Sequence, residues 1–139
     1  MKTLTIAQQA FLRHDALHSL TDYRGVLSLH AYARLALIAE DAEMLADARE
    51  RLLLFVRGEL TFPSVNFTNY YCGGNGTAFL LRQGHLPEAE DAVRHYAEEL
   101  VRDAPRNENG VFSHPKYPGE GRIWIDVAFA VTPFLLFAG

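Results

Sequence analysis

Hydrophobic residues recur along most of the chain at the three- and four-residue spacing of an amphipathic helix, and no segment shows the sustained alternation of a strand. The spacing predicts helices over residues 4–20, 26–40 and 42–60. Asp41 is expected to cap the third helix, because an aspartate side chain can accept a backbone N–H of the first turn. The fold class predicted by this pattern is all-α.

The second half of the chain alternates turn-rich and helical stretches. Residues 61–76 are rich in aromatic residues and glycine and lead into a short apolar helix over 77–84. An amphipathic helix follows over 85–104. Residues 105–121 contain three prolines and three glycines and precede a last apolar helix, expected as one segment over 123–138.

The predicted helices are of two kinds. Those beginning at Val26, Thr77 and Ile123 are apolar almost all round, whereas those beginning at Ala42 and Pro87 have a strongly charged side. A helix that is apolar all round is usually covered on both sides, while a two-faced helix lies outside. The pattern therefore predicts antiparallel helical hairpins arranged in two layers.

Two long loops, 60–75 and 104–121, both precede apolar helices of the inner layer. We therefore expect them to emerge at the same end of the protein. Both loops are rich in aromatic, Asn or His residues, which is typical of a functional site carried by loops on a rigid scaffold.

Composition narrows the class of protein. The 139 residues fit a single domain over 1–139, and the formal net charge of −4 with scattered basic residues favours neither nucleic acid nor an anionic membrane as partner. The apolar stretch 123–138 is shorter than the roughly 20 residues needed to span a bilayer, and it contains Asp126 and Pro133. The amino-terminal residues make a poor secretory signal. We expect a cytoplasmic protein with no membrane partner.

The sequence gives little support for a metal site or a catalytic thiol. The single cysteine, Cys72, excludes an intramolecular disulfide. His14 and His18 have helical spacing but no clear third ligand, so neither a metal nor another cofactor is expected. A thiol dyad of Cys72 with His85 or His95 has only the presence of these residues in its favour.

Residues 110–139, GVFSHPKYPGEGRIWIDVAFAVTPFLLFAG, resemble a segment of glycoside hydrolase families 88 and 105. That segment has a His after aromatic residues, a Tyr-Pro turn, an Ile-Trp-x-Asp motif and a closing Pro-Phe-Leu. The resemblance implies an unsaturated glucuronyl or rhamnogalacturonyl hydrolase with the six-hairpin (α/α)6 barrel. Such enzymes remove unsaturated uronic acids from the ends of oligosaccharides made by polysaccharide lyases.

The predicted helices amount to about half of such a barrel, so the chain is similar to the N-terminal half of the toroid. A truncation, a split gene and a half-barrel completed by pairing are three explanations that the sequence leaves open. In the last, a homodimer would form through the open apolar flank, because a large exposed apolar face is normally an interaction surface.

The resemblance implies that Asp126 is the catalytic acid and base. The substrate has a C4–C5 double bond, the enzyme protonates C4, and water adds at C5. One carboxyl group that can be protonated near neutral pH is needed, and apolar neighbours favour the protonated form of a carboxyl group. From the residues alone, a first-turn acid stabilised by the helix dipole is the favoured interpretation of Asp126.

The resemblance also implies substrate contacts in the same segment. His114 stands where the family often has a sugar-contacting His, although Ser113 replaces the Trp that usually precedes it. Trp124 could stack on a sugar ring or belong to the core. Arg122 could bind a substrate carboxylate with two hydrogen bonds or be an ordinary surface residue.

The stretch NYYCGGNG is the second candidate region. Some family members have a second acidic residue near this point, but no Asp or Glu occurs between Thr61 and Glu88. The function of that acid is therefore either absent or replaced by Asn75, which can hydrogen-bond substrate hydroxyls. Tyr71 is expected to bind substrate together with Asn75. The alternative is a Gly/Asn turn with tyrosines that pack in the core.

The sequence leaves two functions open. The first is an enzyme acting on oligosaccharides that end in an unsaturated uronic acid. The second is a non-catalytic helical half-barrel that binds a protein partner or self-associates.

Overall fold

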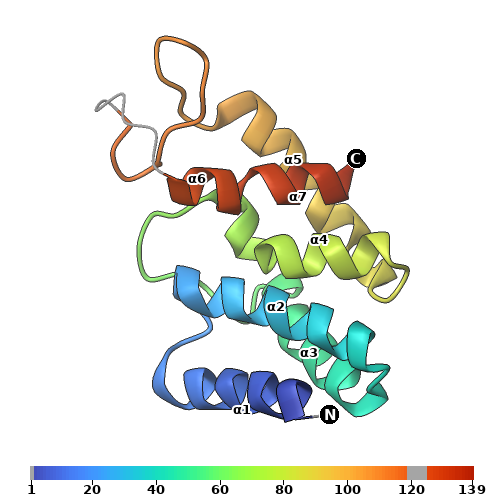
Figure 1. Ribbon diagram of the computed structural model, residues 1–139. Coiled ribbons are helices and arrows are strands. Elements are labelled where there is room, and N and C mark those ends of the chain that lie inside the picture. Colours follow the sequence, from blue (N-terminus) through green and yellow to red (C-terminus); the bar gives the residue numbers. More distant parts are fainter. Residues whose placement is uncertain (1, 119–124) are drawn as a thin grey trace.

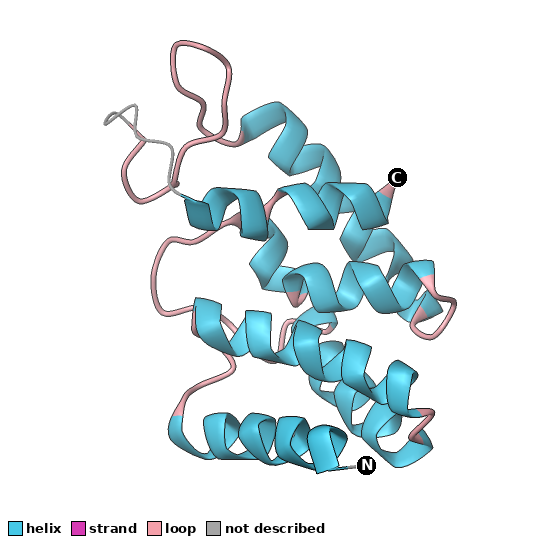
Figure 2. Cartoon of the chain, viewed as in Figure 1, coloured by secondary structure: helices cyan, strands magenta, loops and turns pink. Residues whose placement is uncertain are grey.

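The computed structural model describes residues 2–118 and 125–139, and its regular structure within these ranges is entirely helical (Figures 1 and 2). The elements are α1 (Lys2–Leu17), α2 (Tyr23–Ala39), α3 (Ala42–Val56), the 3-10 helix η1 (Thr68–Cys72), α4 (Gly74–Arg82), the 3-10 helix η2 (Pro87–Ala89), α5 (Glu90–Asp103), α6 (Ile125–Ala130) and α7 (Thr132–Ala138). The predicted all-α class is confirmed.

The helices form two layers of antiparallel hairpins. Helices α2, α4 and α6–α7 run in the same direction in one layer, and α3 and α5 run back behind them (Figure 1). Helix α4 contacts α2 on one side and α7 on the other, α3 packs on α2, and α5 packs on η1 and α7. We call the layer of α2, α4 and α6–α7 the inner layer and that of α3 and α5 the outer layer. The division of the helices between two layers is the one predicted. The inner layer is not covered on both sides, because Ile38, Phe129 and Leu136 are exposed.

One hydrophobic core joins the layers. Each of the helices from α2 to α5, together with α7, contributes a fully buried side chain to it, namely Leu29, Leu52, Leu80, Leu100 and Phe134. In α5 the buried residues Val93 and Leu100 are seven positions apart, and the charged residues lie on the opposite face. Burial of one face therefore holds the outer helix to the inner layer.

Helix α1 lies along α2 at one edge of the protein (Figure 1). The ring of Phe11 stacks on that of Tyr32, with centroids 3.8 Å apart. The guanidinium group of Arg51 on α3 pairs with Asp15 of α1 at 2.8 Å. These contacts join α1 to both helices of the first hairpin.

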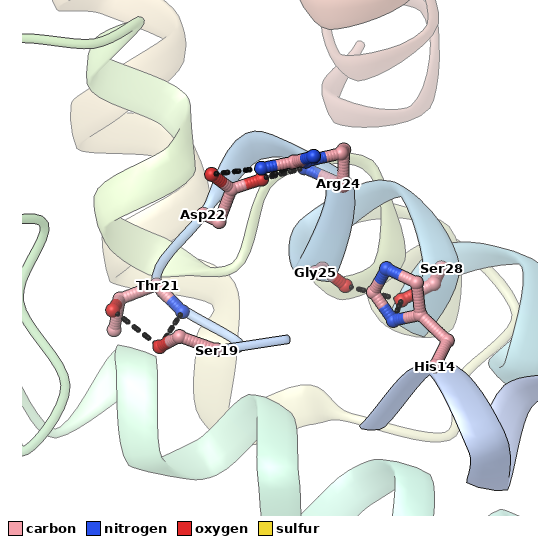
Figure 3. A network of polar contacts seen from close by, with 7 residues as sticks. All are labelled: His14, Ser19, Thr21, Asp22, Arg24, Gly25 and Ser28. Atoms are coloured by element: carbon pink, nitrogen blue, oxygen red, sulfur yellow. Dashed lines mark hydrogen bonds and ion pairs between the residues drawn. The ribbon is translucent and has the colours of Figure 1, made fainter. Parts of the chain in front are cut away.

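The corner between α1 and α2 requires a glycine (Figure 3). A Cβ atom at Gly25 would lie 2.4 Å from the carbonyl oxygen of Ser19, so only glycine lets this loop cross directly over α2. Asp22 caps α2 by accepting the backbone N–H of Arg24 at 2.9 Å. Asp41 caps α3 in the same way, through the N–H of Met44, as the sequence predicts.

A second contact in Figure 3 joins α1 to α2. The hydroxyl of Ser28 donates to the carbonyl of Gly25 at 2.9 Å and lies 3.2 Å from Nδ1 of His14. The single Ser28 proton serves one of these two acceptors, so the direction of the hydrogen bond to His14 depends on the tautomer of His14. In either direction the contact links α1 to α2.

The prediction of one helix over 123–138 is wrong. The segment divides into α6 and α7 at Val131. Pro133 has no N–H to give to the carbonyl of Phe129, four residues earlier, and a proline ring collides with that carbonyl in a straight helix.

Helix α4 also differs from the prediction, because it begins at Gly74 and not at Thr77. Gly73 and Gly74 have φ values of +89° and +58°, in the left-handed region that glycine adopts freely. This conformation lets the chain turn from η1 directly into α4.

His30 is a half-buried ionisable group of the inner layer. Its ring lies 5.7 Å from that of Phe79 and 5.9 Å from that of Phe137, measured between centroids. Nε2 is buried and has no hydrogen-bond partner among the described residues. Burial, with a smaller contribution from the charge of Arg34, lowers the pKa of His30 to about 4. The neutral ring is therefore the form that fits the fold.

We expect His30 to make the fold sensitive to acid. Its pKa is lower in the folded chain than the ordinary value of 6.5, so its contribution is present above pH 6.5 and is lost as the pH falls towards 4. After allowance for the partial exposure of the ring, the loss is about 2 kcal/mol in the free energy of unfolding. Urea unfolding of the wild type and His30→Leu at pH 7 and pH 4.5 measures it.

The variant His95→Leu is the control, because His95 is exposed. His30→Leu should flatten the pH dependence, whereas His95→Leu should leave it nearly unchanged. Equal pH dependence in wild type and His30→Leu would contradict the assignment to His30.

Candidate functional site

A cavity of about 250 Å³ lies beside the first turn of α6. We call it the Asp126 cavity, and its wall is formed by Tyr23, Asn66, Phe67, Tyr70, His114, Lys116, Tyr117 and Asp126. These residues come from the start of α2, from the chain leading through η1, from the loop after α5, and from α6. The two long loops therefore meet at one end of the protein, and this prediction is confirmed.

Asp126 provides the carboxyl group of the cavity. It lies in the first turn of α6 and is half-buried. Its Oδ1 atom is buried and has no hydrogen-bond partner in the part of the chain that the structure describes. A buried polar atom without a partner costs free energy, and at the wall of a cavity a bound ligand can supply the partner.

Tyr70 is the phenol of the Asp126 cavity. Its ring is buried, stacks on Phe62 with centroids 5.9 Å apart, and meets Phe67 edge-on at 6.0 Å. Burial, reinforced by the negative charge of Asp126, raises the pKa of Tyr70 well above its usual value. The hydroxyl therefore keeps its proton at neutral pH and can act as a hydrogen-bond donor.

His114 and Lys116 come from the loop after α5. The His114 ring meets Phe67 edge-on at 5.1 Å, and its Nδ1 accepts the backbone N–H of Lys116 at 3.1 Å. In the neutral imidazole this places the proton on Nε2. The ammonium group of Lys116 lies 5.7 Å from the centroid of the Tyr117 ring. The Asp126 cavity thus combines a carboxyl group, a phenol, an imidazole and an ammonium group.

The predicted site residues are only partly brought together. Asp126 and His114 line the same cavity. Tyr71 lines a different one, of about 180 Å³, on the side of α5. Asn75 is almost fully buried, and its Nδ2 donates to the carbonyl of Phe129 at 2.7 Å. Arg122 and Trp124 lie outside the described residues.

Sequence reasoning missed several residues of the Asp126 cavity. The sequence indicated Tyr71 as a substrate-binding residue and not its neighbour Tyr70. It indicated His114 but neither Lys116 nor Tyr117. Tyr70, Lys116 and Tyr117 could have been predicted from their positions in the two long loops, because the helix pattern places both loops at the same end of the protein. Tyr23 gave no such signal, because it lies at the start of α2.

The thiol of Cys72 is not a reactive nucleophile. The residue is buried, and its Sγ donates to the carbonyl of Asn69 at 3.2 Å. Burial raises the pKa of Cys72 to about 12, so the thiolate is scarce at neutral pH. In this environment a dyad with His85 or His95 is not supported.

Neither a metal site nor a membrane span is found in the described residues. The rings of His14 and His18 lie 4.8 Å apart, but no three His, Cys, Asp or Glu side chains in residues 2–118 and 125–139 are grouped to hold an ion. Over the same residues, each helix is too short or too polar to cross a bilayer.

Comparison of the chain with protein-family models, with curated proteins and with solved structures found no match in any of the three.

Proposed function

We propose that this protein is a glycoside hydrolase that acts on unsaturated uronic acid at oligosaccharide ends, as families 88 and 105 do. The observation that carries the proposal is the half-buried carboxyl group of Asp126. One of its oxygens has no partner among the described residues, and the group lies on the wall of a cavity with a phenol and an imidazole. A cytoplasmic location is part of the proposal.

The reaction needs a single acid. Asp126 in its protonated form gives its proton to C4 of the double bond, and positive charge develops at C5. Water attacks C5 and returns a proton to the Asp126 carboxylate, which restores the acid. The C5 hemiketal breaks its bond to the ring oxygen, which gives a ketone at C5 and a hemiacetal hydroxyl at C1. The hemiacetal then becomes an aldehyde as its C1–O bond to the next sugar breaks, and the leaving oxygen takes the hydroxyl proton. The pair of carboxylates used by ordinary glycosidases is not required for this route.

The other groups of the cavity suit the substrate. The ammonium group of Lys116 can neutralise the uronate carboxylate, and the neutral phenol of Tyr70 can donate to a substrate oxygen. Tyr117, which is half-buried, offers aromatic surface for a sugar ring. The volume of about 250 Å³ is below that of most drug-sized sites, so one terminal ring fits better than a longer segment.

The proposal is tested with an unsaturated disaccharide prepared with a polysaccharide lyase. The ultraviolet absorbance of the double bond should decay when the protein is added, and the disaccharide with a saturated uronic acid should remain intact. No decay with a folded sample at high protein concentration would refute the proposal.

A second candidate function is self-association of a helical half-barrel, with a second copy of the chain as partner. A groove of about 630 Å³ lies between α4, α5 and α7. Apolar residues line it, among them Leu81, Val93, Ala97, Val101 and Leu135, and so do the charged residues Glu90, Arg94, Glu98 and Arg102. Val101 is exposed although it is apolar. A groove of this kind is typical of an interaction surface.

If this groove joins two copies, light scattering should give twice the mass of the chain at micromolar concentration. Ala97→Glu would then give a monomer, because it places a larger, charged side chain among the apolar residues of the groove. Ala46→Glu, at an exposed position of α3, is the matched control and should keep the dimer. A monomeric wild type would rule out this candidate.

A further inference from the structure

The break between α6 and α7 leaves backbone carbonyls that two distant side chains bind. Nδ2 of Asn75 donates to the carbonyl of Phe129 at 2.7 Å, and Nδ2 of Asn69 donates to that of Ala130 at 2.8 Å. In a continuous helix the carbonyl of residue 129 would accept the N–H of residue 133, but that residue is Pro133. The amide of Asn75 takes the place of the missing donor.

These two amides are built into the interior. Asn69 is 0% exposed and Asn75 is 2% exposed. Their Oδ1 atoms have no hydrogen-bond partner among the described residues. Turning either amide over would set its oxygen against a carbonyl oxygen, so the orientation is fixed by the chemistry. Each side chain leaves its Oδ1 atom without a partner. The N–H groups that the two amides donate to the carbonyls at the break explain why they are buried there nevertheless.

The same bonds connect the break to the Asp126 cavity. Asn69 directly precedes Tyr70 in η1, and Asn75 lies in the first turn of α4. Phe129 and Ala130 are three and four residues after Asp126, which is one helical turn. The amide of Asn69 therefore holds α6 against η1, which carries Tyr70, and the amide of Asn75 holds α6 against the start of α4. These two bonds fix the positions of the Asp126 carboxyl group and the Tyr70 phenol across the cavity.

We propose that Asn69 and Asn75 are positioning residues for Asp126, acting through the carbonyls of Phe129 and Ala130. The part that concerns catalysis rests on the proposed function. The part that concerns the backbone does not, because it can be measured on the protein alone.

The backbone part is tested by hydrogen exchange with a rescue variant. In Asn75→Leu the amides of Val131 and Leu135, which donate to the carbonyls of Val127 and Val131, should exchange about tenfold faster. Adding Pro133→Ala supplies an N–H for the carbonyl of Phe129, so Asn75→Leu/Pro133→Ala should exchange at the rate of Pro133→Ala alone.

Asn69→Leu is the matched control for the rescue. Its carbonyl partner is Ala130, which residue 133 does not serve in a helix. Pro133→Ala should therefore leave the faster exchange of Asn69→Leu uncorrected. Unchanged exchange in Asn75→Leu, or equal rescue of both variants, would overturn the proposal. If Asn75→Leu does not fold, a folded double variant supports it and an unfolded one overturns it.

The catalytic part is tested by kinetics on the unsaturated disaccharide. Asn75→Leu should lower kcat about 10- to 100-fold with KM within about threefold, because displacing a proton donor affects the chemical step more than binding. The double variant should recover to within about threefold of Pro133→Ala. Full activity in Asn75→Leu would overturn the positioning role. An inactive wild type that still gives the exchange rescue would refute the proposed function and support the amide contacts.

Discussion

Replacing Asp126 by Asn is expected to lower kcat on an unsaturated uronyl disaccharide by about 10²- to 10⁴-fold, with KM changed by less than about threefold. The amide keeps the shape of the carboxyl group and most of its hydrogen bonding, but it has no proton to give to C4. Initial rates follow from the absorbance of the double bond over a range of substrate concentrations.

Asp91→Asn is the matched control, because Asp91 occupies the first turn of α5 and is exposed. It should leave kcat and KM at the wild-type values. Both variants should melt within a few degrees of the wild type, since neither change removes buried apolar volume. More than about a tenth of wild-type activity in Asp126→Asn would exclude Asp126 as the proton donor.

Phe134→Ala is expected to lower the free energy of unfolding by about 3–5 kcal/mol, which is close to the whole stability of many small domains. The Phe134 side chain is 0% exposed and lies on α7, which packs on both α4 and α5. Removing the ring leaves a void at the meeting point of the two layers, and a close-packed interior fills it only in part. Urea unfolding measures the loss.

Phe129→Ala makes the same chemical change five residues earlier, where the ring is 59% exposed. Its effect should stay below about 1 kcal/mol, because little apolar surface returns to water. Equal losses in the two variants would contradict the packing of α7 against α4 and α5.

The framework was predictable from the sequence because the signals are local. Helical spacing, the cap at Asp41 and the charged sides of α3 and α5 each depend on residues a few positions apart. The break at Val131 was not predicted, although Pro133 stands in the sequence. The apolar run 123–138 indicates burial, but it does not reveal that Asn69 and Asn75 supply the donors for a broken helix.

The candidate site was harder to predict than the framework. Asp126 and His114 could be named from a motif, whereas Tyr70 and Tyr71 are adjacent and have the same side chain. In a 3-10 helix successive residues turn by about 120°, so the two rings face different cavities. Asn75 has the polarity of a ligand-binding residue, but its amide is bound to a backbone carbonyl 54 positions away. Contacts over such distances leave no local pattern.

The two ends of the helical layers differ in the length of the connections between helices. At one end, residues 40–41 join α2 to α3, and residues 83–89, which include η2, join α4 to α5. At the other end lie the chain between α3 and η1 and the loop after α5 (Figure 1). Residues of these two connections form most of the Asp126 cavity. For the proposed hydrolase, a combinatorial library should therefore begin at the exposed positions of the long connections and leave buried residues such as Phe67 and Ser113 unchanged.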